Sequence, residues 1–264
     1  MTTSSLHLPS AVDEALLDAT RISMLAEQSG HLPPVLAASS WPTNAEMIVD
    51  VVRLGFIRPS DVVVDLTWGS GVWWRKYQHP GQFIAVCNDR RKDGTLKEPP
   101  LADNITVATA DFTALDEHHF PTGMAAVTAF DPPYVSVGGR DTSTIPKFLE
   151  SYGLRDAARH PRTLHAYNML GLREACRITK PGGYVLVKCM DYVSSGKIQE
   201  AARWMLDDAE EETPLRLVQR FIHVGGAGPQ PKLNLDGTER VQKHARNNYS
   251  TLYIFKKPRR RNAR

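Results

Sequence analysis

The chain has 264 residues, 42% of them hydrophobic, and a formal net charge of +3, so it can bury one full hydrophobic core with at most a small appendage. No apolar run approaches the length of a membrane span, and residues 1–10 have neither the basic start nor the apolar core of a signal peptide, which predicts a soluble protein of the cytoplasm. The three cysteines, Cys87, Cys176 and Cys189, lack a metal-ligand spacing, so we expect no metal site, no disulfide framework, and three reduced, buried thiols.

The two ends of the chain lie outside the rest of the pattern. Residues 1–40 predict a helical extension, because Ser10 can cap a helix that Gly30 stops. This helix could pack on the sheet, pair with another subunit in a homodimer, or contact substrate. Residues 258–264 form a basic tail. Residues 256–264 contain six Lys and Arg, and removing them leaves a charge of about −3 (3 − 6), so a nucleic-acid contact would have to be local. The alternative for the tail is a solvated terminus.

The segment Trp41-Pro42-Thr43 precedes a predicted helix at residues 45–55, and a Trp-Pro pair before a helix is commonly a hydrophobic anchor. Residues 61–65 predict a strand ending at Asp65. The glycine-rich turn that follows, up to Gly71, lets backbone approach a nucleoside closely. Residues 72–75 predict the start of a helix, whose exposed amides would favour a carboxylate. The turn lacks the third glycine of the dinucleotide fingerprint, which disfavours NAD.

The next two predicted strands also end in acids. Residues 82–87 form the second strand, followed by Asp89, which lies where ribose hydroxyls are bound in open α/β sheets. The third strand, from residue 105, ends at Asp111 and Phe112. A plain turn is the alternative for Asp89, but three successive strands ending in Asp65, Asp89 and Asp111 are hard to explain by surface turns alone.

The apolar run at residues 124–129 predicts a buried parallel strand that stops at Phe130-Asp131-Pro132-Pro133-Tyr134, because proline cannot donate to a strand ladder. Asp131 is then left at the carboxyl edge of the sheet, where such sheets bind their ligands. Two prolines would stiffen the loop, so that a carboxylate, a carbonyl and an aromatic ring keep fixed positions. An ordinary turn is the alternative.

The remaining elements complete an α/β pattern. We expect a helix at residues 166–179, a turn at 180–183, a fifth strand at 184–189, a helix around 198–208, and two closing strands at 215–224 and 250–256. Alternating strands and helices of this kind predict a doubly wound, mostly parallel sheet.

The ordered pair of motifs, Asp65 to Gly71 and then Asp131 to Tyr134, resembles the S-adenosylmethionine-dependent amino-methyltransferases that methylate adenine N6 or cytosine N4 in DNA. In this resemblance Asp131 to Tyr134 is the DPPY catalytic motif, and weaker matches spread from Trp41 to Lys257. Thr67 stands where the family usually has an aromatic residue. The resemblance implies a Rossmann-like class I methyltransferase fold with an antiparallel strand at the edge, a catalytic domain at residues 41–257, and S-adenosyl-L-methionine as the cofactor.

The resemblance also implies roles. Asp131 and the carbonyl of Pro132 would accept the two hydrogens of the target amine, and Tyr134 would stack on a base rotated out of the duplex. Asp89 would bind the cofactor ribose, Asp111 its adenine amino group, and Phe112 its ring. The implied cofactor-binding residues are Trp41, Pro42, Thr43, Asp65, Thr67, Gly69, Gly71, Asp89, Asp111 and Phe112.

The expected partner is DNA, bound through two basic, loop-rich regions at residues 135–165 and 225–249 that include Arg140, Lys243 and Arg246. Solvated loops are the alternative for both regions. Asp131 favours adenine N6, because family members that act on cytosine often have Ser in its place. The competing functions are an RNA base N-methyltransferase and a catalytically silent subunit that binds cofactor or nucleic acid.

Overall fold

A computed structural model describes residues 41–88, 103–134, 160–225 and 247–259 of the chain. The chain divides into two compact units, Met1–Ala37 and Ala38–Arg264, and all described residues belong to the second unit. The predicted N-terminal helical extension lies outside the described residues.

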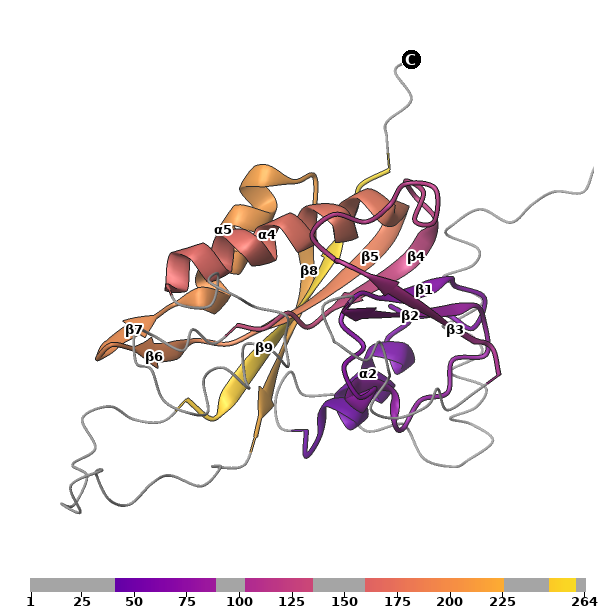
Figure 1. Ribbon diagram of the computed structural model, residues 1–264. Coiled ribbons are helices and arrows are strands. Elements are labelled where there is room, and N and C mark those ends of the chain that lie inside the picture. The colour runs from indigo at the N-terminus through magenta and orange to yellow at the C-terminus, as the bar shows by residue number, and fades with distance from the viewer. Residues whose placement is uncertain (1–40, 89–102, 135–159, 226–246, 260–264) are drawn as a thin grey trace, which may run out of the picture. The chain divides into compact units, whose positions relative to one another are not determined.

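A single mixed sheet forms the centre of the second unit (Figure 1). Among the described residues it has seven strands in the order β3-β2-β1-β4-β5-β9-β8. Strands β1 to β5 are parallel to one another, and β9 runs antiparallel between β5 and β8. The strands are β1 (Val63–Asp65), β2 (Phe83–Asn88), β3 (Ile105–Ala110), β4 (Ala125–Phe130), β5 (Thr179–Cys189), β8 (Arg216–Val224) and β9 (Tyr249–Lys256).

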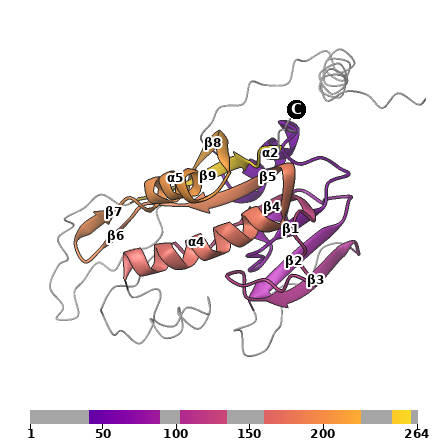
Figure 2. The ribbon, with the colours of Figure 1, turned by 90° about the horizontal axis from the view of Figure 1, so that it is seen from above.

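Helices cover both faces of this sheet. Helix α2 (Asn44–Arg53) lies on one face, whereas α4 (Pro161–Ile178) and α5 (Ala201–Glu212) lie on the other (Figures 1 and 2). Successive strand residues point to opposite faces, so Val63 joins the core under α2 and Val64 joins the core under α4 and α5. The predicted doubly wound, mostly parallel α/β sheet is confirmed. The antiparallel strand, expected at the edge, is β9, and it lies one position inside the edge strand β8.

The helix predicted to begin at residues 72–75 is wrong. The structure has only a single 3₁₀ turn, η1 (Val72–Trp74), before the chain turns back towards β2. Pro80 follows Val72 by eight residues (80 − 72), which is too short for a helix and a return connection, and proline removes a helix hydrogen bond. The consecutive side chains of Trp73 and Trp74 are both buried instead.

The helix predicted around residues 198–208 begins later than expected. Ile198 lies in a small hairpin made of β6 (Tyr192–Ser194) and β7 (Lys197–Gln199), and α5 starts only at Ala201. Ser195 and Gly196 both have positive φ, 50° and 74°, as tight two-residue hairpin turns require. The predicted turn at residues 180–183 is drawn into β5, where pairing with β4 shifts between Ala125 and Val127.

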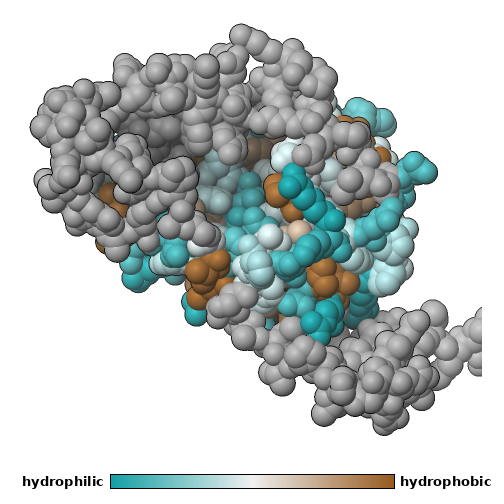
Figure 3. All heavy atoms as spheres, turned by 90° about the horizontal axis from the view of Figure 1, so that it is seen from below, coloured by the Kyte–Doolittle hydropathy of each residue, from teal (hydrophilic) through white to brown (hydrophobic). Residues whose placement is uncertain are grey.

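The described residues also allow the expectations on membrane spans and cysteines to be compared with the structure. None of its helices has the length and apolar character needed to cross a bilayer. Cys87, Cys176 and Cys189 are buried, as predicted. The face carrying α2 is mostly hydrophilic where it is described, with a few hydrophobic side chains scattered over it (Figure 3).

Candidate active site

The predicted acids converge at one edge of the sheet. Asp65 ends β1, Asp131 directly follows β4, and Asp111 directly follows β3. Because these strands are parallel, their carboxyl ends face the same edge, where open α/β sheets bind ligands. Asp89 lies outside the described residues.

The turn after β1 depends on its glycines. Gly69 and Gly71 have φ of +58° and +66°, a left-handed conformation that side chains rarely adopt. A Cβ on Gly71 would also lie 2.6 Å from Cζ2 of Trp68. The Trp68 ring in turn packs edge-on against Phe83 at 5.6 Å, within the core on the α2 face of the sheet. The turn therefore keeps a fixed shape against the end of β1.

The carboxylate of Asp65 holds this turn through hydrogen bonds. It is 5% exposed, and its carboxylate accepts hydrogen bonds from the Trp74 indole at 2.7 Å and from the Thr67 amide at 2.9 Å. Burial raises the pKa of Asp65 to about 6; the bonds from Trp74 and Thr67 oppose the rise, and the nearby charge of Asp131 adds to it. The carboxyl of Asp65 thus titrates close to neutral pH.

Asp131 presents one occupied and one free carboxylate oxygen. Its Oδ2 accepts a hydrogen bond from the Trp73 indole at 3.1 Å and lies 3.7 Å from Nζ of Lys188. Its Oδ1 is buried and has no hydrogen-bond partner among the described residues. Burial raises the pKa of Asp131, whereas Lys188 and Trp73 oppose the rise. Because Trp73 lies just after the glycine turn, the carboxylate points towards that turn.

Thr67 joins the two motifs. Its hydroxyl accepts a hydrogen bond of 2.6 Å from the backbone amide of Asp131, while its own amide donates to Asp65. A phenylalanine at this position could not accept that bond. The family resemblance implies that Thr67 binds the cofactor, which stays a prediction, and the structure adds that Thr67 holds the loop after β4 against the glycine turn.

The proline-rich loop after β4 is held from two further elements. Asn168 on α4 donates from Nδ2 to the carbonyl of Pro133 at 2.8 Å. Lys188 on β5 lies 3.5 Å from the Tyr134 hydroxyl and 5.8 Å from the centre of its ring. Sequence reasoning missed Asn168 and Lys188. A lysine inside the otherwise apolar run of β5 is a signal that could have been found, whereas Asn168 gives none.

The segment ahead of α2 uses its side chains within the fold. The Trp41 indole donates to Asp50 at 2.7 Å and its ring packs edge-on against Phe221 at 5.3 Å. The Thr43 hydroxyl caps α2 by accepting from the amide of Glu46. Contact between Trp41, Pro42 or Thr43 and a cofactor therefore stays a prediction.

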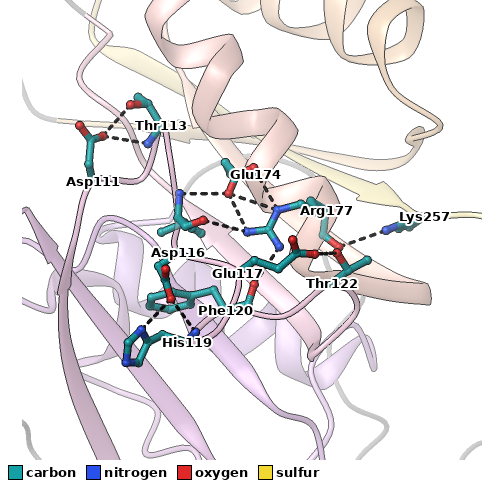
Figure 4. Close-up of polar contacts among 11 residues, drawn as sticks. Asp111, Thr113, Asp116, Glu117, His119, Phe120, Thr122, Glu174, Arg177 and Lys257 are labelled. Carbon is teal, nitrogen blue, oxygen red and sulfur yellow. Dashed lines mark hydrogen bonds and ion pairs between the residues drawn. The ribbon is translucent and has the colours of Figure 1, made fainter.

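Asp111 and Phe112 begin the connection from β3 to β4. Oδ1 of Asp111 accepts from the amide and hydroxyl of Thr113 (Figure 4). The Phe112 ring is buried and packs edge-on against Phe130 and Tyr167, each at 5.3 Å. Their proposed contacts with the cofactor adenine stay predictions.

The end of α4 fixes this connection in place. Arg177 donates to the carbonyls of Phe120 at 2.8 Å and Leu115 at 3.4 Å and pairs with Glu174 at 2.7 Å (Figure 4). Lys257 donates to the carbonyls of Cys176 and Thr179, both at 2.7 Å. The residues that carry Asp111 are thereby tied to the helix that also holds Pro133.

Most of the predicted nucleic-acid surface, including Arg140, Lys243 and Arg246, lies outside the described residues. At the border of the second region, Asn247 and Tyr249 contact Asp191, which follows β5; the Tyr249 hydroxyl lies 3.5 Å from its carboxylate. In the part of the chain that is described, no group of acidic, His and Cys side chains could hold a metal ion.

Comparison with known proteins gives distant structural likenesses only. No family model and no curated protein matches the chain. A chain from the complex of the Haloferax volcanii Trm112 methyltransferase activator with a candidate methyltransferase has a TM-score of 0.49 at 15% identity, covering 96% of this chain and 100% of that one. A candidate RNA methyltransferase from Pyrococcus horikoshii has a TM-score of 0.46 at 15% identity, with 81% and 83% covered. A candidate hemolysin from Streptococcus thermophilus has a TM-score of 0.47 at 11% identity; the likeness covers 81% of this chain, which spans 66% of that protein's length. Likenesses at this level carry no information on activity.

Proposed function

We propose that this protein transfers a methyl group from S-adenosyl-L-methionine to an exocyclic amine of a DNA base, with adenine N6 as the target. The observation that carries the proposal is Oδ1 of Asp131, a buried acceptor beside the glycine turn that has no hydrogen-bond partner among the described residues. A buried acceptor left unpaired costs about 1–3 kcal/mol, so its presence favours a ligand that brings an N–H donor.

An aromatic exocyclic amine is a poor nucleophile, because its lone pair is delocalised into the ring. In our proposal, Asp131 and the carbonyl of Pro132 accept its two hydrogens and turn the lone pair out of the ring plane. Positive charge would develop on the amine as its bond to the methyl carbon forms and the methyl–sulfur bond breaks, and the carboxylate of Asp131 would stabilise that charge more than it stabilises the ground state. Loss of one N–H proton would then return the methylated amine to its neutral form. The contacts of Thr67 and Asn168 keep this acceptor pair in place before substrate binds.

The residues around the glycine turn fit the proposed cofactor, which supplies an electrophilic methyl group on a sulfonium. Gly69 and Gly71 allow backbone to approach it closely, and the carboxylates of Asp65 and Asp111 suit its positive charges. The residues that would hold it are Trp41, Pro42, Thr43, Asp65, Thr67, Gly69, Gly71, Asp89, Asp111 and Phe112.

In duplex DNA the target base has to leave the stack, which costs a few kcal/mol. Stacking on Tyr134 would return roughly 1–3 kcal/mol of this. Arg140, Lys243 and Arg246 are the proposed contacts to the DNA backbone and base edges.

The test incubates the protein with radiolabelled methyl donor and separate pools of duplex DNA, RNA and protein. We expect label in DNA as N6-methyladenine, and label in RNA alone would replace the proposed substrate with an RNA base. Asp131→Ala should lower transfer by at least about 10²-fold, while cofactor affinity stays within a few-fold.

The matched control is Asp116→Ala, which removes an exposed carboxylate of the β3 to β4 connection, 65% exposed, outside the site. It should leave transfer unchanged. Turnover that survives in Asp131→Ala would show that Asp131 is not the acceptor, and label in no pool would favour a subunit without activity.

A further inference from the structure

Lys188 is the one lysine or arginine that the described part of the chain buries. It is the second-to-last residue of β5, and its side chain is 6% exposed. Burying an ammonium is costly unless it is paired. Within the described residues its partners are Oδ2 of Asp131 at 3.7 Å and the Tyr134 hydroxyl at 3.5 Å. Both partners belong to the proposed catalytic loop after β4, whereas Lys188 itself lies on β5.

The register of the sheet explains why Lys188 faces Asp131. Phe130 on β4 pairs with Val187 on β5, so the next residue along each of these parallel strands is Asp131 and Lys188. On its other side Lys188 pairs with Leu252 of β9. The position of Lys188 is thus set by the pairing of β5 with β4 and β9 inside the sheet.

Other ionisable groups face this pair. Asp65 on β1 is close enough for its charge and that of Asp131 to oppose each other, and the Cys189 thiol lies near both Asp131 and Lys188. Burial, together with the charge of Lys188, lowers the pKa of His223 on β8. Oδ1 of Asp131 is buried, although 28% of the side chain is exposed, and a second carboxylate lies nearby. Both conditions disfavour the ionised form of Asp131.

We propose that Lys188 is the positioning residue that keeps Asp131 ionised and turned so that its free oxygen accepts the amine of the target base. The inference rests on the proposed function for the identity of the amine. A protonated carboxyl would present an O–H donor to the target and could not stabilise positive charge on it. Through Tyr134, the same ammonium also fixes the hydroxyl end of the proposed stacking ring.

The decisive measurement does not involve methyl transfer. Isotope-labelled aspartate carboxyl carbons are followed by NMR as pH is raised, and the Asp131 signal is identified by its loss in Asp131→Asn. In Lys188→Met the titration midpoint of Asp131 should rise by about one pH unit or more, a tenfold change in its acid dissociation constant. Lys188→Arg, which keeps the charge, should restore the midpoint to within about half a unit.

The second readout is the pH profile of kcat/KM for methyl transfer to duplex DNA, whose acidic limb should move with the NMR midpoint in Lys188→Met and return in Lys188→Arg. A merely structural role would lower activity without moving this limb. Lys188→Gln repeats both measurements with a polar, uncharged side chain, in case Lys188→Met does not fold.

An Asp131 midpoint that is the same in wild type and in a folded uncharged variant overturns the inference. Failure of the proposed function would give a different result: the Asp131 midpoint would shift as expected, but no radiolabelled methyl group would be found in DNA, RNA or protein.

Discussion

Replacing the buried carboxyl of Asp65 by an amide, Asp65→Asn, should change how the stability of the protein depends on pH. Burial raises the pKa of Asp65 from the ordinary 3.8 to about 6. A raised pKa means that the folded protein prefers the neutral acid, so this contribution to stability is complete below pH 3.8 and is lost as pH rises through 6. The variant has no such titration.

The size of the effect follows from the two pKa values. Their difference corresponds to roughly 3 kcal/mol at about 1.4 kcal/mol per pH unit, and about 1.4 kcal/mol of it falls between pH 5 and pH 8. The wild type should therefore lose about 1.4 kcal/mol of unfolding free energy relative to Asp65→Asn over that interval. A hydrogen bond lost with Trp74 or Thr67 would add only an offset independent of pH.

Urea unfolding of both proteins at several pH values between 5 and 8 measures this difference. All other titrating groups are shared and cancel, except Asp131, whose charge contributes to the raised pKa; the comparison is therefore repeated in an Asp131→Asn background. A free-energy difference that stays flat, or that moves in favour of the wild type as pH rises, would refute the reasoning that Asp65 is buried and strained in its ionised form.

Two further predictions concern the loops that meet at the carboxyl edge. Gly71→Ala should destabilise the protein by more than Gly55→Ala. Both positions have positive φ, which costs about 1 kcal/mol for alanine, but a Cβ added at Gly71 lies 2.6 Å from the Trp68 ring, whereas a Cβ added at Gly55 has nothing within 4 Å. Equal shifts in urea midpoint would contradict the packing argument. Thr67→Val should cost roughly 1–3 kcal/mol, because the amide of Asp131 loses its acceptor, and should lower methyl transfer. Thr67→Ser keeps the hydroxyl and should retain both; a serine variant as impaired as the valine variant would show that the hydroxyl is not what matters.

Elements defined by neighbouring residues were predictable from the sequence, whereas elements that depend on contacts between residues far apart in the sequence were not. The strands at residues 63–65, 83–88, 105–110 and 125–130 were recognisable, because buried parallel strands are short apolar runs with clear stops. The helix expected after the glycine turn was not, because the burial of two adjacent tryptophans and the return to β2 are tertiary effects. The hairpin β6–β7 was missed because its turn, Ser195-Gly196, adjoins a helical pattern and looks like its beginning.

By itself the sequence determined which residues end each strand, and therefore that Asp65, Asp111 and Asp131 share one edge of a parallel sheet. Only the tertiary structure decided what each carboxyl does. Trp73 and Asp131 are 58 residues apart, Thr67 and Asp131 are 64 apart, and Lys188 comes from yet another strand. Strand ends follow from local backbone chemistry, whereas the ionisation and orientation of a buried acid depend on every polar group packed around it, and those groups meet only when the sheet assembles.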